Sequence, residues 1–155
     1  MQKELLEAWQ TNNRVNLYLI DRIEPAGMKC TLSRRGGRDV ALQFAHMHNV
    51  RVWQLEKRAK DLAKGLSNFE TKVSPDKKEL KKALTASCGA VDSFLVDVLA
   101  GKPKRRGFKK GIFTTLAYFV AHESHHRGII ILTLKECGHP LVKDARDNMW
   151  GWDRL

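Results

Sequence analysis

The sequence predicts an all-α protein folded as an up-and-down four-helix bundle. Four segments carry apolar residues at steps of three and four, loops containing glycine or proline separate them, and no segment alternates with a period of two. Connections of about 10–15 residues between such helices are typical of bundles. The chain has 155 residues, which is enough to bury a core, and we expect a single domain over residues 1–155.

The first predicted helix spans residues 2–23. Its apolar stripe is interrupted in the middle by Asn12, Asn13 and Asn16. Such asparagines are usually solvated or cap a helix end, and in a minority of bundles they line a wet cavity. The residues that follow contain prolines and glycines, which block helices or end them, and are therefore expected to form a loop.

The second predicted helix runs from residue 40 to about residue 64. Asp39 can cap its first turn, and Gly65 stands where helices commonly end. The helix carries His46 and His48, which lie about 200° apart around its axis, so only one of them can face the centre of a bundle. Two apolar stripes compete for that face, one containing each histidine, and periodicity alone does not choose between them.

The third and fourth predicted helices span residues 76–100 and 112–137. The run between Lys102 and Lys110 carries six basic residues and is broken by glycine and proline. We expect it to be a solvated loop that adds little to stability. Phosphate contact is the alternative, but no nucleic-acid-binding motif accompanies the run, so no nucleic-acid partner is expected. Trp150 and Trp152, beyond the last helix, are expected to pack against the bundle.

Composition narrows the class of protein further. The formal net charge is +11, which suits either an anionic ligand or simply a basic domain. The three cysteines are scattered, so neither a disulfide framework nor a thiolate zinc site is expected. No leader-like segment and no apolar run of the roughly 20 residues that a membrane span needs is visible. We therefore expect a cytoplasmic protein with no membrane partner.

The fourth helix carries the residues with the clearest chemistry, in the stretch from His122 to Gly128. His122 and His126 are four residues apart, so on a helix they share one face and can meet a single divalent cation. His125 lies about 100° further round and cannot join them in the same way. In a bundle, a facing helix supplies further ligands, and the second helix offers a third imidazole. Three histidines leave a position open for water or substrate, as in catalytic metal sites.

Two other metal motifs overlap this stretch. The residues from His122 to His126 satisfy HExxH, the zincin signature in which Glu123 would be the general base. Zincins hold their substrates against a sheet, and no strand is predicted. Glu123 and His126 also satisfy the ExxH of di-iron bundles, but a second copy and two further inward carboxylates are missing.

The chain resembles the DinB/YfiT-like superfamily of metal-binding four-helix bundles. The matching segments follow the family's order and cover almost the whole chain. They are Trp9 with Asn12-Asn13-Arg14, Gly36-Gly37, Phe44 to Arg51 with Trp53, His122 to Gly128, and Gly138-His-Pro-Leu141 with Trp150-Gly-Trp152.

The resemblance implies one divalent ion, such as zinc, nickel or iron, bound by His122, His126 and a histidine of the second helix. Counting from the glycine pair favours His46 over His48 for that third ligand. Some members of the superfamily are thiol S-transferases that use a low-molecular-weight thiol such as bacillithiol or mycothiol. The resemblance therefore implies a thiol co-substrate and a small-molecule electrophile, with metal-dependent hydrolysis or a non-catalytic metal-binding stress-response module as alternatives. Relatives commonly form homodimers, so the resemblance implies a homodimer here as well. Ile129 stands where many relatives have glutamine.

Overall fold

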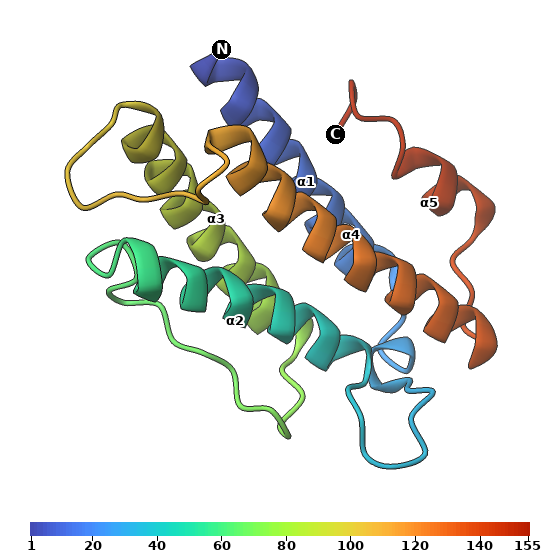
Figure 1. Ribbon diagram of the computed structural model, residues 1–155. Helices are drawn as coiled ribbons and strands as arrows, with labels where there is room; N and C mark the ends of the chain where they lie inside the picture. Colours follow the sequence, from blue (N-terminus) through green and yellow to red (C-terminus); the bar gives the residue numbers. More distant parts are fainter.

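A computed structural model describes residues 1–155 and contains four long helices (Figure 1). They are α1 (Gln2–Arg22), α2 (Val40–Arg58), α3 (Lys77–Leu99) and α4 (Ile112–Glu136), with a 3-10 turn η1 (Gly27–Lys29) and a short helix α5 (Lys143–Asn148). The prediction of an all-α four-helix bundle is confirmed. None of the helices is both long enough and apolar enough to cross a membrane.

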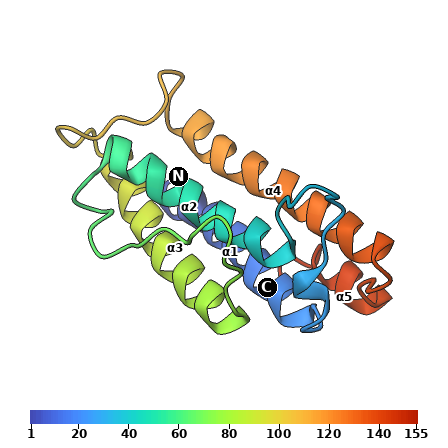
Figure 2. The same ribbon diagram turned by 90° about the horizontal axis from the view of Figure 1, so that it is seen from below.

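The helices do not simply alternate in direction, because α2 and α3 run the same way (Figure 2). Ser74 donates a 2.5 Å hydrogen bond to Asp39, joining the starts of these two helices. Lys81 near the start of α3 lies 2.7 Å from Asp21 near the end of α1, so α1 is antiparallel to α3. Residues 59–76 therefore cross back along the length of the bundle, and the amide of Asn49 holds this crossover by two bonds to the backbone of Phe69.

The sequence predicted that α2 would extend to about residue 64, but the helix ends earlier, at Arg58. Ala59 leaves the helical conformation, with φ −157° and ψ 58°. The chain has to reverse here to reach the start of α3 at the other end of the bundle. Gly65 has the left-handed φ of 82° that glycine favours, but it lies within this turn and not at a helix end.

The core consists of two apolar clusters with a polar layer between them. One cluster of 17 buried residues contains Leu19 and Phe44, and another of 10 contains Trp9 and Leu95. The layer between them consists of buried side chains that bond to one another, namely Asn12, Asn13, Asn16, Arg51, Ser87, Glu123 and Arg127. The asparagines of α1 are thus part of the core, and the usual solvated or capping role does not apply to them.

The basic run between α3 and α4 is attached to the bundle. Arg105 lies 2.8 Å from Asp97 and also pairs with Asp61, and only 9% of its side chain is exposed. Phe108 packs against Tyr118, with ring centroids 4.9 Å apart. The expectation of a fully solvated loop is therefore wrong for Arg105 and Phe108.

The C-terminal segment contains α5, which was not predicted from the sequence. Ala145 and Met149 are buried in the larger apolar cluster and hold this segment against the bundle. Trp150 and Trp152 are 77% and 51% exposed, and their rings stack on each other at a centroid distance of 6.4 Å. The tail thus packs on the bundle as expected, but through Ala145 and Met149.

Candidate metal centre

Three histidines from two facing helices come together between α2 and α4. One ligand atom each of His46, His122 and His126 lies within 4.8 Å of the other two. The Nε2 atoms of His122 and His126 are 3.1 Å apart, as the spacing of four residues on α4 predicts. The ring of His46 lies 4.8 Å from that of His126 and 5.3 Å from that of His122, centroid to centroid.

These nitrogens fit a single divalent ion. Metal–imidazole bonds of about 2.0–2.1 Å place two nitrogens of one coordination sphere roughly 3 Å apart, close to the separation of the pair on α4. No other histidine, cysteine, aspartate or glutamate belongs to the group. The chain therefore offers three nitrogen ligands and leaves the rest of the coordination sphere open.

Gln43, one turn before His46 on α2, orients one member of the group. Its Oε1 atom accepts a 2.7 Å hydrogen bond from Nδ1 of His126. A proton held on Nδ1 leaves the lone pair on Nε2, and this is the atom that faces His122. Sequence reasoning missed Gln43. Its position three residues before His46, and hence on the same face of α2, was the available signal.

We expect Gln43→Leu to lower the affinity for a divalent ion by about 10- to 100-fold, the usual effect of losing a group that orients a metal-binding histidine. The imidazole of His126 would then be free to rotate or to carry its proton on the other nitrogen. Titration of the metal-free protein with zinc in competition with a chromophoric chelator measures the change. Gln10→Leu is the control, because Gln10 is half-buried like Gln43 but bonds to Asp92, away from the histidines. Equal affinities for the two variants would contradict this role.

His48 points away from the cluster toward α3. Its Nδ1 lies 3.1 Å from the hydroxyl of Ser87 and its Nε2 lies 3.1 Å from the carbonyl oxygen of Ser67. Both ring nitrogens of this buried side chain are therefore occupied by partners other than a metal. His125 is exposed and lies outside the three-histidine group. Of the two histidines on α2, it is His46 that faces the pair on α4.

Glu123, the glutamate of the HExxH pattern, is not available as a general base. It is only 1% exposed, and Nε and Nη2 of Arg51 bind its two oxygens at 2.6 and 2.9 Å. Asn12 and Asn16 each donate a further 2.6 Å hydrogen bond to Oε2. The carboxylate thus accepts four hydrogen bonds inside the bundle, and its role is to compensate the buried charge of Arg51.

The electrostatics of the site keep its imidazoles neutral. Burial, followed by the positive charge of Arg38, lowers the pKa of His46 to about 4. Burial, followed by the neighbouring His122 and His46, lowers the pKa of His126 to about 3, and burial also lowers the pKa of His122. A neutral imidazole is the form that binds a metal, so all three are ready to bind at neutral pH.

We expect the metal-free protein to lose stability as the pH falls from about 7.5 to 5.5. The unfolded histidines take up protons near their ordinary pKa of about 6.5, while the folded ones resist protonation, so acid favours the unfolded state. Urea unfolding at a series of pH values in the presence of chelator measures the slope. The slope should be shallower in His46→Gln/His126→Gln, and an identical slope in that variant would contradict the assignment.

Fold and site together define a helical bundle with a three-histidine group that could hold one metal ion. The chain belongs to the DinB family, because the model of that family matches residues 1–153. The match includes all four long helices and the three histidines of the group. No curated protein and no solved structure gives a significant match to the chain.

Proposed function

We propose that this protein binds one divalent ion through His46, His122 and His126 and transfers a low-molecular-weight thiol to an electrophilic small molecule. The observation that carries the proposal is the convergence of three neutral imidazoles with no fourth protein ligand in the group. Structural zinc sites are closed by a fourth protein ligand, whereas catalytic sites keep a position open. Three imidazoles suit zinc, nickel and iron alike.

When bound here, the ion would lower the pKa of a thiol at the open position, so that a thiolate nucleophile is present near neutral pH. In the transfer, the sulfur forms a bond to carbon, the leaving group departs with its bonding electrons, and the thiol proton passes to solvent. The chain orients the imidazoles for this task. Gln43 holds His126, and the ring of Tyr118 stacks on that of His122 at 15° and 6.1 Å.

Arg38 supports a negatively charged thiol as the co-substrate. Its charge acts on all three histidines and lowers the pKa of each of them. Its side chain is exposed and has no acidic partner, so the charge is free to attract an anion to the site. An acidic thiol would gain this attraction, and a neutral one would not.

Ile129 supports an electrophile with an apolar part. It lies three residues after His126 on α4, and therefore on the face of that helix that meets α2. Its half-buried side chain cannot offer the hydrogen bonds of the glutamine found in many relatives. An apolar side chain on this face favours substrates that lack a polar group at this point.

The test is metal analysis of protein purified without added ions, followed by a transfer assay with alkyl halides. The assay compares cysteine, glutathione, bacillithiol and mycothiol, with and without chelator. We expect one ion per chain and halide release that needs both the ion and a thiol. Activity should disappear in His126→Ala and persist in His125→Ala. Bound metal without thiol consumption would contradict the transferase and favour a non-catalytic module, and ester or amide cleavage without thiol would favour a hydrolase.

A further inference from the structure

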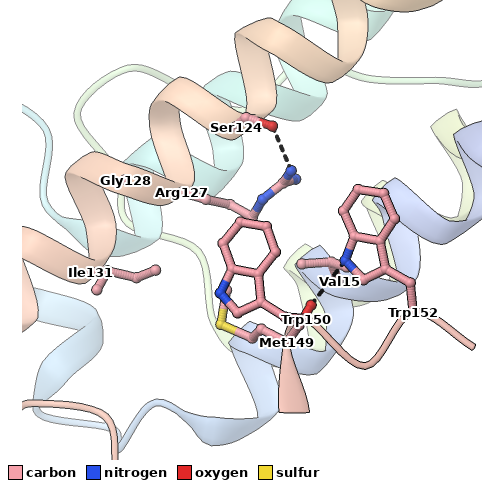
Figure 3. Close-up of a pocket in the computed structure, with 8 residues that line it drawn as sticks. All are labelled: Val15, Ser124, Arg127, Gly128, Ile131, Met149, Trp150 and Trp152. Carbon is pink, nitrogen blue, oxygen red and sulfur yellow. Dashed lines mark hydrogen bonds between the residues drawn. The ribbon is translucent and has the colours of Figure 1, made fainter. Parts of the chain in front are cut away.

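A cavity lies on the side of α4 away from the three histidines, between α1, α4 and the C-terminal segment (Figure 3). Its volume is about 230 Å³. The apolar part of its wall is formed by Val15, Ile131, Met149, Trp150 and Trp152. No residue of the three-histidine group lines it, so it is separate from the candidate metal centre.

The polar part of the wall is Arg127, a buried guanidinium that has no carboxylate partner. The residue is 8% exposed and donates hydrogen bonds to Asn12, Asn16 and Ser124 at 2.7–2.8 Å, all of them neutral. The nearby carboxylate of Glu123 is already bound by Arg51. The polar layer thus holds two guanidinium groups and one carboxylate, which leaves one positive charge uncompensated.

The hydrogen bonds of Arg127 leave part of its guanidinium free. An arginine side chain has five N–H donors, and three are used here. Nε bonds to no protein atom, and Nη2 bonds only to Ser124. Nε and Nη2 are the atoms with which Arg51 binds both oxygens of Glu123. Arg127 therefore retains the edge that recognises a carboxylate.

The tryptophans form an aromatic wall beside this charge. Figure 3 shows the ring of Trp150 next to Met149, and both residues line the cavity together with Arg127. The indole N–H of Trp152 donates to the carbonyl oxygen of Met149 at 3.1 Å, which restrains that ring. Both rings keep large exposed surfaces that a ligand would cover. The exposed tryptophan rings and the charge of Arg127 together fit one ligand that has an apolar body and an acidic end.

We propose that this cavity binds a small monocarboxylate with an aromatic or branched aliphatic body. The carboxylate lies against Nε and Nη2 of Arg127, and the body packs on Val15, Ile131 and Trp150. The cavity is smaller than the roughly 300–1,000 Å³ of sites for drug-sized ligands, which limits the occupant to about the size of phenylacetate. The ligand supplies the negative charge that the polar layer lacks.

Isothermal titration calorimetry with phenylacetate and its neutral analogue phenylacetamide, in the presence of chelator, tests this proposal. We expect saturable binding of the acid and binding of the amide that is at least about tenfold weaker, because only the acid makes charge-assisted hydrogen bonds. Chelator excludes binding to a metal at the histidines, and an unchanged affinity in Arg38→Ala excludes binding there. Equal affinity for acid and amide would overturn the proposal.

Ser124→Asp supplies the missing charge from the chain itself. The new carboxylate would lie next to Nη2 of Arg127 and compete with the ligand, so binding should be lost while the melting temperature stays the same or rises. Ser93→Asp, at an exposed serine of α3 remote from the cavity, is the matched control and should bind normally. Unchanged binding in Ser124→Asp would contradict the site.

A second copy of the chain is the alternative occupant, given the predicted homodimer and the exposed tryptophans. Sedimentation velocity of the wild type and of Trp150→Ala separates the two. A monomer that binds phenylacetate supports the ligand site, with affinity reduced in Trp150→Ala. A dimer that Trp150→Ala dissociates, together with no binding of phenylacetate, would overturn it.

Discussion

His122→Ala and His126→Ala are each expected to lower the affinity for a divalent ion by more than the roughly 100-fold that loss of an orienting group alone can cause. Each removes one of three nitrogens, and two imidazoles cannot hold the ion with comparable strength. His46→Ala should behave in the same way, because its ring completes the group from α2. Metal content after dialysis, followed by competition titration with zinc, measures the loss.

The other two histidines on these helices serve as controls. His125→Ala should keep its ion, because His125 is exposed and outside the group. His48→Ala should also keep it, although removal of the bonds from His48 to Ser87 and Ser67 will lower stability. If a folded His48→Ala protein lost the ion while His46→Ala retained it, the assignment of the third ligand would be wrong.

The second large effect is expected in the polar layer of the core. Glu123→Ala should destabilise the metal-free protein by about 3–5 kcal/mol, the usual result of removing one member of a buried ion pair. Arg51 is fully buried and would be left with no counter-charge, next to a second buried guanidinium at Arg127. At roughly 2–4 °C per kcal/mol for a chain of this size, the melting temperature should fall by about 10 °C.

Differential scanning calorimetry in chelator tests this expectation, with Glu136→Ala as the control at an exposed glutamate of the same helix. Glu136 forms no ion pair, so its loss should change the melting temperature by no more than about 2 °C. A Glu123→Ala protein as stable as the control would show that the buried pair of Arg51 and Glu123 does not stabilise the fold. Glu123→Gln, which keeps part of the hydrogen bonding, should retain the ion, and loss of the ion there would revive the ExxH interpretation, in which Glu123 is a metal ligand.

Much of the fold could be predicted because helices depend on local patterns. The apolar steps of three and four placed four helices within a few residues of their observed ends, except at the end of α2. Helix α2 ends at Arg58 because the chain must turn back there toward the start of α3. The apolar pattern of a helix carries no information on the direction of the next element. The sequence pattern also does not say at which end of the bundle α3 begins. That α2 and α3 run parallel could therefore be seen only in the structure.

The candidate metal centre divides in the same way. His122 and His126 could be paired from the sequence, because their relation is set by the pitch of one helix. Their partner on α2 could not be chosen by periodicity, since α2 packs against both α3 and α4 and each of its two histidines faces one of them. Resemblance to a family favoured His46, and the structure shows His46 at α4 and His48 at α3.

By itself, the sequence determined that the chain is helical, that two histidines of one helix share a face, and that the family is DinB. Only the tertiary structure decided that Gln43 orients His126, that Glu123 belongs to the core, and that Arg127 is a buried charge without a carboxylate. The physical reason is the separation along the chain of the residues that each kind of contact joins. Helix geometry relates residues up to four positions apart, whereas Gln43 meets His126, and Asn12 meets Glu123, across 83 and 111 positions. Such contacts exist only once the helices have packed.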